Sequence, residues 1–138
     1  RLDTIQAAVG LEMIKKIKKI TNSRIKNANY LNKNLKNIRQ IELIEEKKNY
    51  KSVYHLYQFF CKRRDELNNF LRKNKIDSKI HYPKPLHLHD AAKKFKYRKG
   101  QFISAESLSD KVLSIPVHEY IKKKQLDYII NKIKFFYK

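Results

Sequence analysis

A short segment from Ile80 to His89, IHYPKPLHLH, gathers several side chains that could bind an anion. Pro83 and Pro85 restrict their own backbone and that of the residue before each, so the segment should be extended and stiff. Imidazole and phenol groups can donate hydrogen bonds to phosphate oxygens, and a nearby lysine adds positive charge. Residue types alone leave two interpretations open. The segment is either a ligand-contacting turn or a structural turn in which Tyr82 packs and the histidines are exposed.

Metal binding and nucleophilic catalysis have weaker support. His87 and His89 are two residues apart and would share one face of a strand, but no cysteine or second carboxylate is near them in sequence. A solvated loop is the stronger interpretation, so we expect no metal site. The single cysteine, Cys61, ends an apolar run, which favours a core residue over a reactive thiol.

The charge of the chain is extreme, with 33 Lys and Arg against 13 Asp and Glu and a net charge of +20. Such a charge suggests a polyanion partner: nucleic acid, an anionic membrane or a phosphorylated ligand. A compositional bias toward Lys, Asn and Ile would explain it equally well. The lysines are spread along the whole chain, which favours the compositional explanation. A standalone basic module that binds nucleic acid or another polyanion remains the alternative function.

No apolar run approaches the roughly 20 residues of a membrane span, so we expect no membrane partner. One cysteine excludes an intrachain disulfide and fits a cytoplasmic protein.

Hydrophobic periodicity predicts a long helix at the start of the chain. Apolar residues recur every three or four positions over residues 5–20 and again over 25–38. Neither glycine nor proline separates the two stretches, so one helix is favoured, with room for a bend at Thr21–Ser23. Asp3 or Thr4 could cap its start.

The rest of the chain alternates between short strand and helix patterns. Predicted strands cover residues 41–44, 53–61, 79–82 and 112–117, the last one near a sheet edge because Pro116 cannot donate to a ladder. Predicted helices cover residues 64–74, 91–97 (closed by Gly100), 104–111 and 121 to the end. The expected fold class is α/β (an α+β small domain): a long N-terminal helix followed by a small mixed or antiparallel sheet covered by helices.

Several motifs, in this order, resemble the DegT/DnrJ/EryC1/StrS aminotransferase family. The first is RLDTIQAA, from Arg1 to Ala8, which is similar to the start of a long helix in that family. The others are Val53–Tyr57, Arg64–Leu67, His81–His87 (HYPKPLH) and Ala105–His118, the last ending in VLSIPVH. Each motif is weak alone, but the ordered set is specific and covers nearly the whole chain.

The resemblance implies a fold and an activity. It implies the C-terminal domain of an aspartate-aminotransferase-type (fold type I) pyridoxal phosphate enzyme. Residues 1–40 would connect to a large domain that binds the cofactor, and residues 41–138 would form the small domain. It further implies a cytoplasmic homodimer that transfers an amino group, usually from glutamate as the amino donor, to a nucleotide-linked keto-sugar. Such a reaction serves amino-sugar and surface polysaccharide biosynthesis.

The resemblance also assigns roles to particular residues. The lysine that forms the Schiff base with pyridoxal phosphate in the family lies upstream of every motif matched here. We therefore expect this chain to contain no catalytic residue, to bind no cofactor by itself and to be inactive alone. His81 and Tyr82 correspond to a pair near the diphosphate of the nucleotide-sugar. His87 and Arg1 are weaker candidates for substrate binding, and either could be structural.

Overall fold

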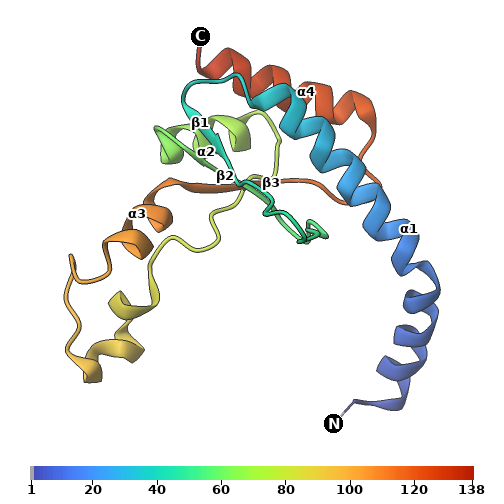
Figure 1. Cartoon of the computed structure of the whole chain (residues 1–138), viewed down its shortest axis with the longest axis horizontal. Coiled ribbons are helices and arrows are strands. Elements are labelled where there is room, and N and C mark those ends of the chain that lie inside the picture. Colours follow the sequence, from blue (N-terminus) through green and yellow to red (C-terminus); the bar gives the residue numbers. More distant parts are fainter. Residues whose placement is uncertain (1) are drawn as a thin grey trace.

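The computed structural model describes residues 2–138, which form a three-stranded antiparallel sheet packed against helices. The N-terminal part of the first helix and the segment ending in α3 project away from this core in different directions (Figure 1). The helices are α1 (Thr4–Leu35), α2 (Arg64–Lys73), α3 (Ile103–Lys111) and α4 (Lys123–Phe136), the strands are β1 (Ile41–Leu43), β2 (Tyr57–Cys61) and β3 (Val112–Ile115), and two 3₁₀ turns cover Leu86–Leu88 and Asp90–Phe95. The predicted fold class is confirmed.

The strand β2 lies at the centre of the sheet. It pairs with β1, where Ile41 is opposite Cys61, and with β3, where Phe59 is opposite Leu113. Strand β3 lies at one edge of the three-stranded sheet, as predicted.

The hydrophobic core lies between the sheet and the helices α1, α2 and α4. Alternate residues of β2 are buried in it, because successive side chains of a strand point to opposite faces. The C-terminal part of α1 lies beside α4 above the sheet (Figure 1). Fully buried apolar side chains come from each of these elements: Ala28, Leu31, Leu35, Phe59, Leu67, Leu71, Leu113 and Ile133.

Helix α1 begins at a capping box. The Asp3 carboxylate accepts a hydrogen bond from the Ile5 N–H at 3.0 Å, and the Gln6 side chain accepts one from the Asp3 N–H at 3.2 Å. The helix continues without interruption through Thr21–Ser23. The predicted cap at Asp3 and the prediction of one long helix are both confirmed.

The apolar face of α1 is buried only along its C-terminal part. Met13 and Leu31 are 18 residues apart, as are Ile17 and Leu35, which is five helical turns and therefore the same face. Leu31 and Leu35 are fully buried, whereas Met13 is 48% and Ile17 56% exposed. Among residues 2–138, no helix has the length and hydropathy to cross a membrane. The division of the chain near residue 40 remains a prediction.

All four predicted strands are shorter in the structure: β1 ends one residue and β3 two residues before the predicted end, and the other two differ more. The prediction of a strand over residues 53–61 is wrong at its start, because Tyr54 has a φ of 49° and this left-handed backbone cannot join a ladder. The predicted strand over 79–82 is wrong beyond Lys79, which makes an isolated bridge with Ser114. The next carbonyl available for pairing, that of His81, accepts a hydrogen bond from the Gln58 side chain instead.

The segment predicted as a helix over residues 91–97 is instead a 3₁₀ turn, Asp90–Phe95. Lys96 ends it with a left-handed φ of 56°, so the predicted closure by Gly100 is wrong. Gly100 has a φ of 92°, a conformation that favours glycine, and it lies in the loop that leads into α3.

Arg64, at the start of α2, holds the C-terminal end of α3. Its Nη1 donates to the Ser109 carbonyl at 2.9 Å and to the Val112 carbonyl at 3.5 Å, and the residue is buried. The last carbonyls of a helix lack partners within the helix, so a buried guanidinium satisfies them. Its Nε lies 2.8 Å from the Asp65 carboxylate, although the angle falls outside hydrogen-bond geometry.

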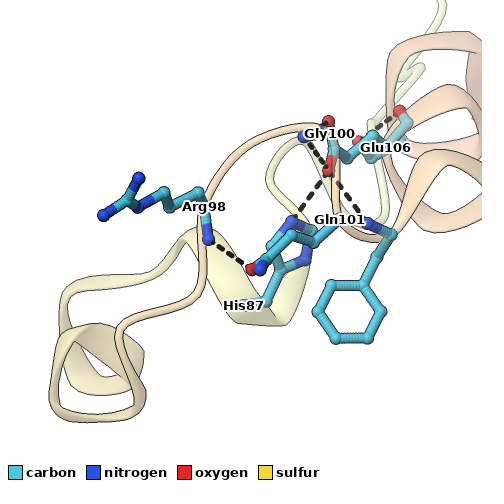
Figure 2. Close-up of polar contacts among 7 residues, drawn as sticks. His87, Arg98, Gly100, Gln101 and Glu106 are labelled. Atoms are coloured by element: carbon cyan, nitrogen blue, oxygen red, sulfur yellow. Dashed lines mark hydrogen bonds and ion pairs between the residues drawn. The ribbon is translucent and has the colours of Figure 1, made fainter.

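Glu106, on α3, holds the loop in front of that helix. Its carboxylate accepts hydrogen bonds from the N–H groups of Gly100 (2.8 Å) and Phe102 (3.3 Å) and contacts His87 Nε2 at 3.0 Å (Figure 2). Burial alone would raise the pKa of Glu106, but these hydrogen bonds outweigh it and lower the pKa below its usual value of 4.5.

Replacing Arg64 tests the link between α2 and α3. The change Arg64→Met keeps most of the apolar stem but leaves the Ser109 and Val112 carbonyls without a donor. We expect a loss of about 1–3 kcal/mol in the free energy of unfolding, measured by urea titration. The exposed Arg72→Met, on the same helix, is the matched control and should change stability by at most about 0.5 kcal/mol. Equal stability of the two variants would contradict the proposed role of Arg64.

Replacing Glu106 tests the loop anchor through its pH dependence. Because its folded-state pKa is lowered, the carboxylate stabilises the fold above its ordinary pKa of 4.5, and this contribution is lost as pH falls through the lowered value. Thermal unfolding between about pH 7 and about pH 3 should therefore show a steeper acid loss of stability in the wild type than in Glu106→Gln. The variant should be less stable at neutral pH. The exposed Glu42→Gln should retain the slope of the wild type; parallel curves for all three proteins would contradict the prediction.

Candidate functional site

His81 belongs to the stiff segment after Lys79, and side chains of the strands β2 and β3 hold it in place. The Gln58 Nε2 donates to the His81 carbonyl at 3.0 Å and lies 3.4 Å from the Ser114 Oγ. Ser114 Oγ lies 2.9 Å from His81 Nδ1. Since Ser114 accepts from Gln58, its hydroxyl hydrogen is free to point at Nδ1, and a neutral His81 then carries its proton on Nε2. The neighbouring Tyr82 is 74% exposed and meets the His81 ring edge-on, with ring centroids 5.9 Å apart.

A large cleft opens beside this pair. Its volume is about 800 Å³, and it lies between the His81–His89 segment, the following 3₁₀ turn and α3. Most of its wall is apolar or aromatic, with Phe60 of β2 and Val112 of β3 at its base. The other lining residues are His81, Tyr82, Lys84, Pro85, Leu86, His87, His89, Ala92, Phe95, Tyr97, Phe102, Ala105, Leu108 and Ser109.

The structure brings three of the four predicted binding residues to this cleft. His81, Tyr82 and His87 line it, whereas Arg1 lies outside the described residues. The side chain of His87 is only 7% exposed; its Nε2 contacts Glu106, and its ring lies 4.7 Å from that of Phe102. This arrangement gives His87 a structural task in holding the cleft wall, and a direct contact with substrate stays a prediction.

The other candidates from the sequence are engaged in the fold. His89 Nε2 lies 3.0 Å from the Lys84 carbonyl. Within residues 2–138, no three His, Cys, Asp or Glu side chains gather closely enough to hold a metal ion. Cys61 is buried in the core, and burial raises its pKa to about 11, so the thiol stays protonated near neutral pH. The prediction that Cys61 is a core residue is confirmed.

A second hollow, of about 390 Å³, also includes His81, and Arg24 in its wall was not singled out from the sequence. It is lined by His55, His81 and His118 together with Arg24, Lys79 and Ser114, among others. Arg24 Nη1 donates to the His55 carbonyl at 3.1 Å, and Nη2 lies 3.2 Å from Glu119. The pKa of Glu119 is lowered by its own backbone N–H and by the Arg24 charge, against the effect of burial. The sequence signal that could have identified Arg24 is a charged residue on the otherwise apolar face of α1.

Comparisons with known proteins agree on one family. A model of the DegT/DnrJ/EryC1/StrS aminotransferase family matches residues 1–134. A pleiotropic regulatory protein of Geobacillus stearothermophilus is 31% identical over 140 residues, covering 100% of this chain and 38% of that protein. The erythromycin biosynthesis sensory transduction protein EryC1 of Saccharopolyspora erythraea is 32% identical over 134 residues, covering 97% of this chain and 37% of that protein.

Solved structures give the same result. DesV from S. venezuelae, in complex with a ketimine intermediate, superposes with a TM-score of 0.96 at 29% identity, over 100% of this chain and 37% of DesV. A DegT/DnrJ/EryC1/StrS aminotransferase from Brucella abortus superposes with a TM-score of 0.91 at 35% identity, over 99% of this chain and 36% of that protein.

The chain thus spans less than two fifths of the length of these relatives, and nearly all of its own length matches them. The ordered motifs, the long helix followed by a small antiparallel sheet, and the match over residues 1–134 agree with one another. The chain belongs to the DegT/DnrJ/EryC1/StrS aminotransferase family.

Proposed function

We propose that this chain is the small-domain portion of a pyridoxal-phosphate-dependent sugar aminotransferase. The whole protein would move an amino group, from glutamate, onto a nucleotide-linked keto-sugar for amino-sugar and surface polysaccharide biosynthesis. The observation that carries the proposal is the family match over residues 1–134. Further support comes from a Streptomyces venezuelae relative named dTDP-3-amino-3,4,6-trideoxy-alpha-D-glucose transaminase, which is 34% identical over 82 residues, covering 59% of this chain and 22% of that protein.

The residues that line the large cleft do not fit the cofactor by themselves. Pyridoxal phosphate acts as an electron sink when a lysine holds it as a Schiff base and an acidic or basic partner faces its ring nitrogen. Among the residues that line the large cleft, Lys84 is the only lysine, and Asp and Glu are absent. We therefore assign no catalytic step to this chain. We propose that the Schiff-base lysine belongs to a part of the protein outside these 138 residues, which agrees with the short span relative to the relatives.

His81 and Tyr82 would supply contacts to the diphosphate of the nucleotide-sugar. In the tautomer that accepts from the Ser114 hydroxyl at Nδ1, His81 would offer its Nε2–H as a donor, and the exposed Tyr82 offers a hydroxyl beside it. Lys84 at the same cleft adds positive charge. Donors of this kind make strong hydrogen bonds to phosphate oxygens. Because Gln58 and Ser114 hold His81, its ring would already have the binding orientation before the substrate binds.

The exposed apolar face on the N-terminal half of α1 supports the proposal of a larger assembly. Its exposed residues Met13 and Ile17 lie on the face that is buried farther along the helix. Contiguous exposed apolar surface usually marks an interaction site. We propose that the cofactor-binding domain covers this face and that the whole protein works as a homodimer.

A standalone polyanion-binding module remains the alternative proposal. It depends on the net charge of +20, whereas the family match accounts for the same segments without a nucleic-acid partner. The two proposals differ in their ligand: a diphosphate at His81 and Tyr82, or a long polyanion held by dispersed lysines.

One prediction of the proposed function concerns the cofactor. The chain of 138 residues, mixed with excess pyridoxal phosphate, should show no stoichiometric aldimine band and no transaminase activity with glutamate. Surface lysines will react weakly and without saturation, so the measurement is a titration followed by absorbance. A saturable band with one aldimine per chain, retained on gel filtration, would overturn the proposal.

Another prediction of the proposed function concerns the anion contact. Inorganic pyrophosphate, titrated into the chain and followed by two-dimensional NMR, should shift the signals of residues 80–86. Tyr82→Phe and His81→Ala should each weaken binding roughly tenfold, because a hydrogen bond to a charged group contributes about 1.5 kcal/mol. Tyr120→Phe is the matched control, as Tyr120 is 80% exposed and outside the cleft.

Equal affinities for all these proteins would contradict a role of His81 and Tyr82. Binding of pyrophosphate that random-sequence DNA displaces in every variant, with a steep salt dependence, would instead favour the polyanion module.

A further inference from the structure

Three polar side chains, from Gln58 through Ser114 to His81, form a continuous chain of hydrogen bonds. Gln58 and Ser114 lie opposite each other on β2 and β3, and the main chain of Ser114 pairs with that of Lys79 on its other side. Gln58 Nε2 lies 3.4 Å from Ser114 Oγ, which lies 2.9 Å from His81 Nδ1. The same Nε2 donates to the His81 carbonyl at 3.0 Å. The two strand residues therefore hold His81 at both its ring and its backbone.

The amide of Gln58 sets the direction of this chain. The His81 carbonyl can only accept a hydrogen bond, so the atom of Gln58 that faces it is the nitrogen, which can only donate. Ser114 Oγ then accepts from that nitrogen. His81 Nδ1 is the acceptor that remains for the Ser114 hydroxyl hydrogen, so a neutral ring carries its proton on Nε2.

The opposite tautomer would leave a buried donor without a partner. Ser114 is only 4% exposed. If Nδ1 carried the proton, Ser114 Oγ would accept from both neighbours, and its own hydrogen would meet no other acceptor among residues 2–138. An unpaired buried donor costs free energy, and the Nε2–H tautomer avoids this cost. The fold therefore selects one tautomer of a ring that can adopt either.

We propose that Gln58 and Ser114 are positioning residues that hold neutral His81 in the Nε2–H tautomer and so make it a hydrogen-bond donor to an anion. The inference rests on the proposed function for the ligand, a diphosphate, and it adds two residues that act through His81. A phosphate oxygen offers lone pairs, so it binds an Nε2–H and is repelled by a bare Nε2. Within residues 2–138, Nε2 has no protein partner, which leaves it for a ligand.

The first measurement is the tautomer of His81 in the 138-residue chain. Long-range proton–nitrogen correlation spectra at about pH 8, where an ordinary imidazole is neutral, show which ring nitrogen carries the proton. His81→Gln identifies the signals of this ring among the five histidines. The wild type should show the Nε2–H form alone, and Ser114→Ala should show both forms. Ser78→Ala, which removes a fully buried hydroxyl bonded to Asn68, is the matched control and should keep the wild-type form.

The variant Gln58→Glu should reverse the chain. It is nearly isosteric at a half-buried position, so the fold should be retained. A carboxylate only accepts, so the Ser114 hydroxyl would donate to it and accept from Nδ1, and the proton of His81 would move from Nε2 to Nδ1. Combining Gln58→Glu with Ser114→Ala removes the connecting hydroxyl and should abolish this reversal.

The affinity for inorganic pyrophosphate, measured by calorimetry, should follow the tautomer. Only the Nε2–H form donates, so the apparent dissociation constant should rise as the fraction of this form falls. Gln58→Glu should bind roughly tenfold more weakly than the wild type, the effect of one lost hydrogen bond to a charged group. Ser114→Ala should lie between the two, and Ser78→Ala should bind as the wild type does.

The tautomer and the affinity separate this inference from the proposed function. A wild-type His81 protonated on Nδ1, or a tautomer that neither Gln58→Glu nor Ser114→Ala changes, would overturn the inference. Equal pyrophosphate affinities in proteins whose tautomers differ would also overturn it, because the positioning would then have no effect on the ligand. The expected tautomers in a chain that binds no pyrophosphate would support the positioning and overturn the diphosphate contact of the proposed function.

Discussion

The central strand β2 connects the stability of this small domain to the geometry of its candidate site. One face carries Tyr57, Phe59 and Cys61 into the core, and the alternation of a strand turns Gln58 and Phe60 to the opposite face. Gln58 fixes His81, and Phe60 lines the large cleft. A shift of β2 by one residue would exchange these two sets, so the burial of the core face determines the position of the site.

The two segments that project from the sheet differ in how firmly the rest of the domain holds them. The segment that forms the cleft is held at its start by Gln58, which binds His81, and at its end by Arg64, which binds the end of α3. Within the segment, Glu106 holds the loop before α3. Among residues 2–138, the N-terminal half of α1 makes no comparable contacts, although its apolar face continues the buried one. One segment is held by side chains of the small domain, while the other presents an exposed apolar surface that suits a partner domain.

Periodic elements could be predicted from the sequence, whereas the residues that position His81 could not. The helices α1, α2, α3 and α4 follow from apolar spacing, and β2 from its aromatic run, because burial of one face dictates those patterns. The loop before β2 was predicted as strand, since the left-handed backbone of Tyr54 leaves no mark in composition. Gln58 and Ser114 are 56 residues apart, and only strand pairing brings them to His81. The motif itself pointed to His81 and Tyr82 but did not reveal the cleft beside them.

The most direct measurement is to locate the cofactor in the protein expressed from its complete gene. Borohydride reduction would fix pyridoxal phosphate to the lysine that holds it, and peptide mass spectrometry would identify that lysine. A single modified lysine outside these 138 residues is the predicted result, and it would make this chain the partner that binds the substrate. Modification of a lysine within the chain, or a complete protein that takes up no cofactor, would contradict the assignment.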